Sequence, residues 1–514
     1  MPEPETWKIR NKLTIIVRKK KAEFSMKQID LEPITRKHKE SEIVLEVHCS
    51  GSDRLFFNGY QSWTISHEVS PTESVAPMHP FVRMAGRPWG TTRYGDPFFI
   101  DYTGRRGCFH GFTYMYIRRG DVYTLFGSTD ETNGYTIFYY DAAASELRVV
   151  KDAGFTRKYD KGVHIVCFEG TEDEVFDAWF AASGIRCRDA RPLAGYSSWY
   201  NRYEKIDDKS ITEDLEGCSK VLKPGDLFQI DDGWQIAVGD WEADPVKFPR
   251  GMKASVDDIH AKGFLAGLWL APYSAQNGSS IVSDHQDWLL NRDGSPWYAG
   301  CNWGGFYSLD IDNPQVQAHL RGVFDKIFNE WGFDLVKLDF LYSAAPWETT
   351  RGRYLGESRG GRMCRAMRYL REWCGDGLIL GCGVPLGPAF GQVDYCRIGC
   401  DASLDWENTR LMRRVNREIV STKNAIGDIY YRRQLDHRAF LNDPDVFFLR
   451  SHNLKLTHSQ KDMHARLCAQ YGSMLLTSDN MGLYDKGQLA RYNEYLDIWK
   501  NKNWDDLSFL DTIK

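Results

Sequence analysis

The stretch 334-DLVKLDF-340 reads as a buried β-strand that ends in charged residues. Leu335 and Val336 suit the core of a parallel sheet, because the strands of such a sheet are covered on both faces. Lys337 and Asp339 follow at alternate positions, and residues two apart in a strand point to the same face. Two opposite charges therefore share one side of the C-terminal end of this strand, either as a satisfied ion pair or as part of a functional site.

Seven further segments are similar to this one, and they alternate with helical patterns from about residue 191. The helical patterns include residues 315–332 and 362–375. Eight strand–helix units over about 300 residues predict a (β/α)8 barrel, placed at residues 190–505, with a doubly wound open sheet as the alternative. The predicted strands are 193–200, 226–232, 264–273, 334–340, 378–384, 395–401, 446–450 and 473–479.

The first part of the chain has a different sequence pattern. Short β-rich runs, such as 43-IVLEVHCS-50 and 134-GYTIFYYD-141, are divided by Gly, Asp, Asn and Ser. This pattern favours antiparallel sheets, so residues 1–185 are predicted to form an N-terminal β-sandwich domain. Residues 173–182 show a helical period and lead out of that domain. Residues 506–514 are predicted to form a C-terminal tail.

The composition argues against several classes of protein. A net charge of −5 without a long basic run disfavours nucleic-acid binding. No window approaches the roughly 18 apolar residues of a membrane span, and residues 1–10 lack the apolar core of a signal peptide. The 12 cysteines show neither CxxC pairs nor zinc spacing, which indicates reduced thiols, a cytoplasmic location and no structural metal.

Charged and aromatic residues gather at the C-terminal ends of the predicted strands, where the active site of such a barrel forms. Asp339 ends the fourth strand and Asp401 ends the sixth, so the two carboxylates can flank one bond of a substrate. Paired carboxylates are the groups that glycoside hydrolysis needs. Lys337 lies beside Asp339 and is expected to keep it ionised, whereas Asp401 has Arg397 four residues back on the same face.

Short motifs follow one another along the chain, mostly at predicted strand ends. They are 58-NGYQSW-63, 196-YSSWYNRY-203, 229-QIDDGWQ-235, 240-DW-241, 269-WLAPY-273, 336-VKLDF-340, 381-GCG-383, 397-RIGCD-401 and 478-SDN-480. Their combination and order resemble the α-galactosidases of glycoside hydrolase family 36, within the clan of retaining α-galactosidases. The resemblance implies an exo-acting retaining enzyme that releases terminal α-linked galactose from oligosaccharides or glycans without a cofactor or metal.

The resemblance also leaves some properties open. An α-N-acetylgalactosaminidase of the same family is the nearest alternative, and a catalytically silent carbohydrate-binding barrel is the alternative from another class. A homo-oligomer is left open. Members of the family usually carry a further C-terminal β-domain, which this chain is expected to have only in short form or not at all.

Site residues follow from the resemblance, position by position. Asp339 corresponds to the nucleophile and Asp401 to the general acid/base. The pair at 231–232 corresponds to carboxylates that accept hydrogen bonds from the galactose 4- and 6-hydroxyls, and Lys337 corresponds to the lysine that reaches the 3- and 4-hydroxyls. That pair is Asp231 and Asp232. The resemblance further places Cys382 and Gly383 near the 2-position, Arg397 near the acid/base, and Trp199, Trp234 and Trp269 in the pocket walls. Trp63 would close the pocket from the first domain of the same chain or of a neighbouring subunit.

Each position also has a structural interpretation. Asp339 can serve only to neutralise Lys337, and Asp401 can cap a following helix. The aspartates at 231–232 can belong to an Asp-Gly turn. The tryptophans can be ordinary core residues, and Cys382 can be a small buried hydrophobe.

Two further features are less specific. The segment 301-CNWGGFYSLDID-312 lies between the third and fourth predicted strands, where substrate-shaping loops occur, and Asn302, Trp303 and Tyr307 are candidate sugar contacts. Cys400 directly precedes Asp401, with no predicted effect beyond local packing.

Overall fold

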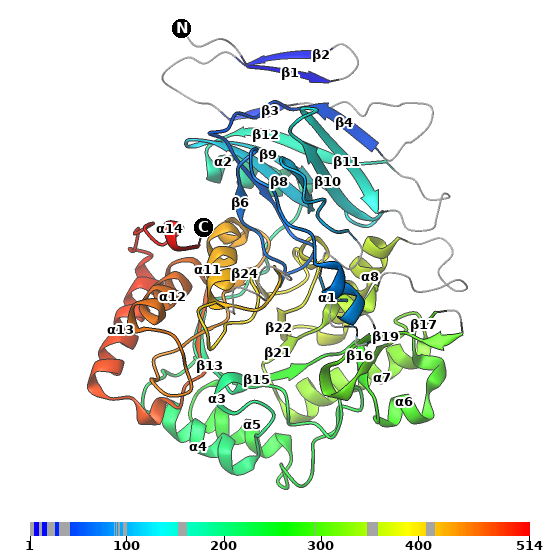
Figure 1. Ribbon diagram of the computed structural model, residues 1–514. Coiled ribbons are helices and arrows are strands. Elements are labelled where there is room, and N and C mark those ends of the chain that lie inside the picture. The colour runs from blue at the N-terminus through cyan, green and yellow to red at the C-terminus, as the bar shows by residue number, and fades with distance from the viewer. Residues whose placement is uncertain are drawn as a thin grey trace.

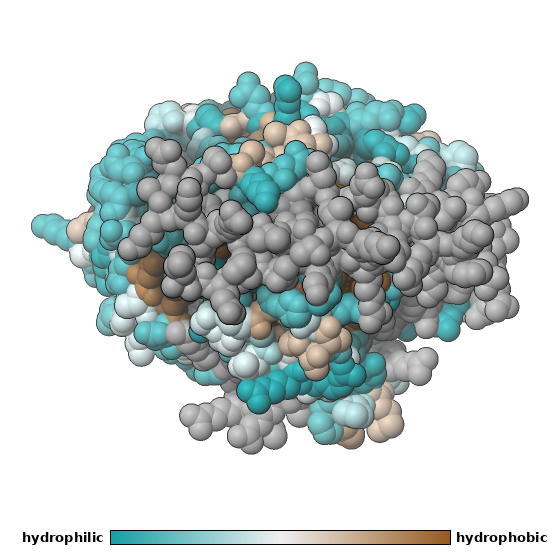
Figure 2. Space-filling model, turned by 90° about the horizontal axis from the view of Figure 1, so that it is seen from above, coloured by the Kyte–Doolittle hydropathy of each residue, from teal (hydrophilic) through white to brown (hydrophobic). Residues whose placement is uncertain are grey.

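The computed structural model describes residues 5–9, 13–17, 26–29, 42–86, 88, 90, 93–95, 100–152, 162–292, 294–346, 358–407 and 417–513. The chain folds into a β-rich N-terminal part that lies against one end of a larger barrel (Figure 1). Seen from above Figure 1, most of the described side chains at the N-terminal end are hydrophilic, with small apolar areas between them (Figure 2). Many apolar side chains of this part are buried, either in its own core or in a cluster shared with the barrel.

The N-terminal part contains two six-stranded antiparallel sheets with the orders β2-β1-β4-β11-β10-β7 and β3-β12-β9-β8-β5-β6. Inward-pointing side chains of both sheets form one core, among them Leu45, Phe138, Met115 and Phe126. The strands of the first sheet are β1 (Glu5–Ile9), β2 (Leu13–Val17), β4 (Glu42–Glu46), β7 (Cys108–Phe112), β10 (Tyr135–Asp141) and β11 (Glu146–Asp152). Those of the second are β3 (Lys27–Ile29), β5 (Arg54–Phe57), β6 (Glu68–Val69), β8 (Tyr114–Arg119), β9 (Val122–Ser128) and β12 (Ile165–Gly170).

The helix α2 (Glu172–Ser183) joins the N-terminal part to the barrel. It begins with a capping box between Thr171 and Glu174. Trp179 packs so closely on the second sheet that a Cβ at Gly127 would lie 2.4 Å from the indole nitrogen, so glycine is required there. On its other side Trp179 contacts Phe390 of the barrel, at 5.9 Å between ring centroids. The helix predicted at 173–182 is therefore confirmed, and it forms part of the contact between the two parts.

Eight parallel strands form the barrel, as the sequence predicts, and the doubly wound alternative is wrong. The sheet order is β24-β23-β22-β21-β15-β14-β13-β26-β25. Its two end strands are consecutive pieces of the chain, separated only by Pro444 and Asp445, so the seventh strand closes the sheet. The strands are β13 (Leu193–Ser197), β14 (Leu227–Ile230), β15 (Leu265–Leu270), β21 (Leu335–Leu338), β22 (Leu378–Gly381), β23 (Tyr395–Arg397), β24 (Leu441–Asp443), β25 (Val446–Phe447) and β26 (Met474–Thr477).

Helices surround this barrel and connect its strands (Figure 1). Most of the longer ones begin at a side-chain cap, for example Asp207 before α4 and Asn313 before α7. Within the described ranges, none is long and apolar enough to cross a lipid bilayer. The helices are α1 (Pro80–Gly86), α3 (Trp199–Arg202), α4 (Asp208–Cys218), α5 (Met252–Ala261), α6 (Ser280–Asp284), α7 (Pro314–Asp325), α8 (Arg359–Cys374), α9 (Leu386–Ala389), α11 (Thr422–Tyr431), α12 (His458–Tyr471), α13 (Lys486–Asn501) and α14 (Leu510–Ile513).

Two additions modify the plain barrel. Between β15 and β21 the chain inserts the short strands β16 (Ser274–Gln276), β17 (Asn291–Arg292), β18 (Ser295–Pro296), β19 (Tyr298–Gly300) and β20 (Phe306–Ser308). At the other end of the barrel domain, the segment expected to be a tail from residue 506 contains α14, which packs on α11. Phe509 is 1% exposed and contacts Tyr430, so this residue anchors the segment to the core.

Candidate active site

A pocket of about 270 Å³ lies at the carboxyl ends of the barrel strands. In barrels of this kind the opposite end and the interior are filled, so chemistry concentrates at this mouth. The structure brings most of the predicted site residues together here. Those lining the pocket are Trp63, Trp199, Asp231, Asp232, Trp269, Lys337, Asp339 and Asp401.

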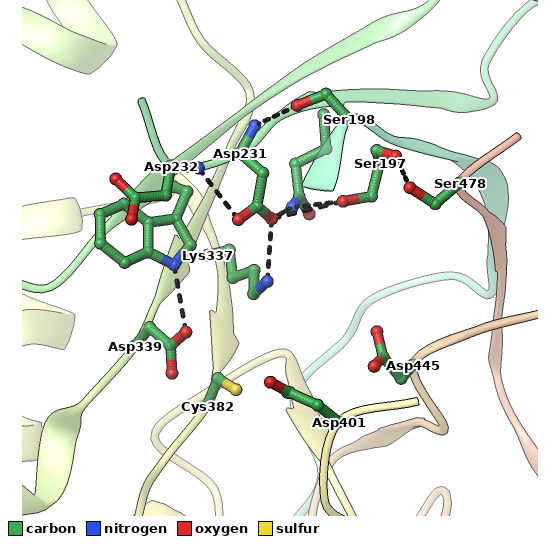
Figure 3. A network of polar contacts seen from close by, with 12 residues as sticks. Ser197, Ser198, Asp231, Asp232, Lys337, Asp339, Cys382, Asp401, Asp445 and Ser478 are labelled. Atoms are coloured by element: carbon green, nitrogen blue, oxygen red, sulfur yellow. Dashed lines mark hydrogen bonds and ion pairs between the residues drawn. The ribbon is translucent and has the colours of Figure 1, made fainter. Parts of the chain in front are cut away.

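Asp231 follows β14 directly and is held on every side (Figure 3). Its Oδ2 accepts hydrogen bonds from Nζ of Lys337 (2.8 Å), from the amide of Gln229 (2.6 Å) and from the hydroxyl of Ser197 (3.3 Å). Its Oδ1 accepts from the backbone N–H of Asp232 (2.9 Å). At 2% exposure this carboxylate has a single orientation, which also fixes the next residue.

Lys337 occupies the centre of the polar cluster. It lies on β21 and reaches the pocket on the same side as Asp339, as the alternation in the sequence predicts. Its direct partner, however, is Asp231 on the neighbouring part of the barrel mouth, whereas the sequence suggested Asp339. Burial lowers the pKa of Lys337, but the negative charges of Asp231 and then Asp339 outweigh it and raise that pKa, so the ammonium stays charged.

Asp339 comes directly after β21, at a sharp change in backbone direction. Phe340, the next residue, has φ 51°, in the left-handed region that large side chains rarely adopt. Oδ1 of Asp339 accepts from the backbone N–H of Phe340 (2.9 Å), and Oδ2 accepts from the indole N–H of Trp269 (3.1 Å). The carboxylate is therefore oriented toward the pocket by two neutral donors.

Asp232 also lines the pocket. Its Oδ1 accepts from the amide of Gln235 (2.6 Å), and its Oδ2 accepts from the indole N–H of Trp303 (2.8 Å). Burial raises the pKa of Asp232 to about 6, although these two hydrogen bonds lower it. Trp303 belongs to the inserted segment and lines the pocket with Asn302, whereas Tyr307 is outside the lining.

Asp401 differs from Asp339 in its surroundings. Its side chain is 46% exposed, and its Oδ1 accepts from Nη1 of Arg397 (2.9 Å). Removal from water by the surrounding protein raises the pKa of Asp401 to about 6; the charge of Arg397 lowers it, and those of Asp445 and Asp339 raise it. The two carboxylates of the site are therefore held differently, which is the arrangement that separates acid and base roles.

Arg397 lies behind Asp401, outside the pocket lining. Its guanidinium is 3% exposed and donates from Nε to Asp443 (3.0 Å) and from Nη2 to Asp445 (2.8 Å). Sequence reasoning missed both aspartates. The signal was 442-NDPDV-446, a cluster of polar residues around a proline within the seventh strand.

Trp63 reaches the pocket from the N-terminal part of the same chain, so this chain closes its own pocket. Its indole N–H donates to Sγ of Cys382 (3.3 Å), and a Cβ at Gly383 would lie 2.9 Å from the indole ring. Gly383 has φ 56°, which also favours glycine. Cys382 and Gly383 lie beneath Trp63 and are absent from the pocket lining.

The other predicted tryptophans divide into two groups. Trp199 and Trp269 line the pocket, as expected for walls. Trp234 does not: it is fully buried, stacks near Trp241 and donates its indole N–H to the carbonyl of Trp269 (2.9 Å). The prediction that Trp234 forms a wall is therefore wrong, because it lies one layer behind Trp269 and supports it.

Residues 58–67, here called the strap, bind the barrel on both sides of Trp63. Ser62 donates its backbone N–H to the carbonyl of Val384 (2.9 Å). Ser66 donates its backbone N–H to Asp428 of α11 (2.8 Å). Arg432, at the end of α11, is fully buried and donates to the strap and to the barrel together. The N-terminal part is thus built into the site.

Several lining residues had no role in the sequence-based interpretation. Tyr200 and Glu204 follow β13, and the motif 196-YSSWYNRY-203 could have indicated the tyrosine. The others come from loops whose position depends on long-range contacts. The additional lining residues are Tyr94, Tyr200, Glu204, Phe340, Cys400, Glu418 and Val420.

Known proteins are similar to this chain in sequence and fold. The Melibiase family matches residues 189–349. An α-galactosidase of Pediococcus pentosaceus is 28% identical over 133 residues, which are 23% of this chain and 18% of that protein. The matched region therefore spans about a fifth of such curated relatives.

Solved structures extend the similarity to almost the whole chain. TtGalA, an α-galactosidase from Thermus thermophilus solved in complex with stachyose, is 27% identical with a TM-score of 0.75, covering 96% of this chain and 99% of that one. The glycoside hydrolase family 36 α-galactosidase AgaA of Geobacillus stearothermophilus shares the fold, with a TM-score of 0.60 at 12% identity over 89% of this chain and 62% of that one. This chain is therefore similar in sequence and fold to an α-galactosidase over nearly its whole length, and it shares the fold of the family 36 α-galactosidase AgaA.

Proposed function

We propose that this chain is a retaining, exo-acting α-galactosidase that releases terminal α-linked galactose from oligosaccharides. The observation that carries the proposal is the meeting of Asp339 and Asp401 in one pocket, each in a different electrostatic setting. Glycoside hydrolysis needs two carboxyl groups with different roles on either side of the scissile bond. The similarity to TtGalA, which was solved with stachyose, supports galactose as the sugar.

Asp339 is assigned as the nucleophile. Its carboxylate attacks the anomeric carbon as the bond to the leaving oxygen breaks, and a galactosyl ester of Asp339 forms. Asp401 gives its proton to the leaving oxygen in this step. In the second step Asp401, now ionised, removes a proton from water, the water oxygen attacks the anomeric carbon, and the ester bond to Asp339 breaks. Two displacements retain the configuration.

Asp401 suits the exchange of a proton in both steps. A pKa of about 6 leaves both its forms populated near neutral pH. Asp339 suits attack, because the indole of Trp269 and the Phe340 N–H fix its orientation without supplying a charge that would bind it tightly. Lys337 adds a positive charge to the cluster.

The carboxylate pair beside Lys337 is proposed to bind the sugar hydroxyls. Ionised carboxylates accept charge-assisted hydrogen bonds, and those of Asp231 and Asp232 are already oriented by neighbours. An epimer with its hydroxyl on the other side of the ring would leave these buried groups unpaired, so discrimination should be strong. The indole faces of Trp269 and Trp303 offer apolar surface for the ring.

Selection at the 2-position favours galactose over its N-acetylated counterpart. Trp63 contacts Cys382 and crowds Gly383, and the resemblance places the 2-substituent near these two residues. A larger substituent would have to displace the indole. An α-N-acetylgalactosaminidase activity is therefore the less favoured alternative.

The proposal is tested by nitrophenol release from para-nitrophenyl α-galactoside and from the matching N-acetylgalactosaminide. The wild-type chain is expected to turn over the galactoside, and Asp339→Ala to lose that activity by at least a thousandfold. Asp401→Ala should retain more activity on this substrate, since nitrophenol leaves with little help from an acid, and added azide should restore a faster rate by replacing water. A wild-type chain that cleaves neither substrate, or a fully active Asp339→Ala, would refute the assignment.

A further inference from the structure

A break in the seventh strand lies beside Asp401 (Figure 3). β24 ends at Asp443 and β25 begins at Val446, with Pro444 and Asp445 between them. Asp445 has φ 70°, in the left-handed region where Asn and Asp are enriched among residues other than Gly, and its backbone N–H donates to Oδ1 of Asp443 (2.9 Å). This turn buries the Asp445 side chain and directs it toward the loop after β23.

The Asp445 carboxylate binds both ends of the segment that carries Asp401. Its Oδ1 accepts from Nη2 of Arg397 (2.8 Å), whose Nη1 donates to Asp401 (2.9 Å). Its Oδ2 accepts from the backbone N–H of Ala402, the residue after Asp401 (2.7 Å). The same Oδ2 accepts from the hydroxyl of Tyr200, which lines the pocket (2.7 Å).

We propose that Asp445 is a positioning residue for the acid/base carboxyl of Asp401, which it holds toward the pocket through Arg397 and the Ala402 peptide. The inference rests on the proposed function, because it gives Asp445 a part in the proton exchange of Asp401. Without the Asp445 carboxylate, the Ala402 N–H loses its acceptor and Arg397 is shared by fewer carboxylates. Asp401, which already accepts from Arg397, is then drawn more strongly to the guanidinium and away from a leaving oxygen.

The charges around Asp401 also link Asp445 to its protonation. Arg397 and Lys337 lower its pKa, whereas Asp445 and Asp339 raise it. Loss of the Asp445 charge therefore lowers the pKa of Asp401, and its acid form is lost at a lower pH. The proton donor would be depleted and misplaced by the same change.

Tyr200, three cysteines and His464 are titratable neighbours of Asp401 or Asp445 that keep one charge state near pH 6. Burial raises the pKa of Tyr200 and of the cysteine thiols well above their usual values, so these groups stay protonated. Burial lowers the pKa of His464 to about 4, so this imidazole is neutral near pH 6. The remaining neighbours of the two aspartates are Arg397, Lys337, Asp339, Cys382, Cys400, Asp443 and Cys468.

A purely structural role is the alternative, since Asp445 also neutralises the buried Arg397. Asp443 provides the matched comparison. It is equally buried and also binds Arg397, through Nε at 3.0 Å, but it is Asp445 that accepts from the Ala402 N–H and from the Tyr200 hydroxyl. Asp443→Asn and Asp445→Asn therefore remove the same charge from the same cation.

The test compares these two variants by the pH profile of kcat/KM and by leaving group. Asp445→Asn is expected to move the basic limb of the profile down by about one pH unit, and Asp443→Asn to move it less. Asp445→Asn should also lose roughly tenfold more kcat/KM on methyl α-galactoside, whose leaving group needs protonation, than on para-nitrophenyl α-galactoside. Both readouts are independent of the fraction of folded protein, because a pKa and a ratio of two rates do not depend on enzyme concentration.

Two outcomes would overturn the inference: a basic limb that Asp445→Asn shifts no more than Asp443→Asn does, or equal losses on the two substrates. If Asp445→Asn does not fold, Asp445→Gly replaces it, because glycine suits φ 70° and also removes the carboxylate. The same results are expected of it.

A readout without turnover separates this inference from the proposed function. Carbon-13 labelling of aspartate carboxyls, with Asp401→Asn for assignment, reports the pKa of Asp401 directly. A wild-type chain inactive on both galactosides would refute the proposed function and, with it, the role in proton exchange. A lower pKa of Asp401 in Asp445→Asn would still establish the electrostatic link, and an unchanged pKa would refute it.

Discussion

Replacing Arg432 with methionine is expected to loosen the attachment of the strap to the barrel. Arg432 is fully buried at the end of α11. Its Nη1 donates to the carbonyls of Ser62 (2.7 Å) and Ile398 (2.8 Å), and its Nε donates to Oδ1 of Asn58 (3.0 Å). A further donation from Nη2 goes to the carbonyl of Gln61 (3.1 Å). One guanidinium thus joins the strap to the segment that leads to Asp401.

The size of the effect follows from the acceptors that lose this donor. The Gln61 carbonyl keeps a second hydrogen bond, from the backbone N–H of Thr64 (3.0 Å), and is therefore the least affected. Each of the other three acceptors, on Asn58, Ser62 and Ile398, loses its buried donor, and each such loss lowers the free energy of unfolding by about 1–3 kcal/mol. Because methionine fills most of the vacated volume, we expect a loss of about 4 kcal/mol in the free energy of unfolding, a large share of the roughly 5–15 kcal/mol of a typical domain.

Urea denaturation followed by circular dichroism measures this loss, and KM for para-nitrophenyl α-galactoside should rise because Trp63 is carried by the strap. Arg432→Lys serves as the control that keeps the charge. A lysine offers one nitrogen in place of the planar fork, so it should recover only part of the stability. A change below about 1 kcal/mol in Arg432→Met, or a lysine variant as stable as the wild type, would contradict this account of the strap.

Two further predictions concern the pocket. Asp401 must carry a proton when it acts as the proposed acid, and its pKa is about 6. In initial-rate measurements, kcat/KM for an unactivated galactoside should therefore fall as pH rises through that value. Asp401→Asn should abolish this dependence on pH. Trp303→Phe removes the donor that lowers the pKa of Asp232, so that pKa should rise beyond about 6 and KM should increase by roughly tenfold near neutral pH. An unchanged KM would show that Asp232 does not need the indole.

The barrel was predictable because buried parallel strands leave apolar runs with polar ends. This holds for 334–340, whose buried strand Leu335–Leu338 and terminal Asp339 lie as expected. The first half of the seventh strand, β24, was missed because Asn442, Asp443 and Pro444 read as a loop. Asp443 is buried there because Arg397 pairs with it, and only the folded neighbourhood of a strand shows such pairing.

The site was predictable where a residue sits on a strand end. Lys337 lies on β21 and Asp231 directly follows β14, so the strands fix their direction, whereas Asp401 lies in the loop after β23, which ends at Arg397. The tryptophans show the limit: Trp269 lines the pocket and Trp234 lies behind it, although both belong to similar motifs at strand ends. A sequence gives the kind of side chain, whereas the layer that it occupies depends on packing against other elements.

Asp339 and Asp401 differ in how far away in the sequence the residues that hold them lie. Asp339 is held by its own neighbour Phe340 and by Trp269 of the adjacent strand. The segment of Asp401 is bound by the seventh strand through Asp445 and, by way of the Ile398 carbonyl, by Arg432, which also holds the strap. The proposed nucleophile needs one orientation, and these short-range hydrogen bonds supply it. A group that must release and regain a proton needs opposing charges around it, and in this fold several distant elements bring those charges together.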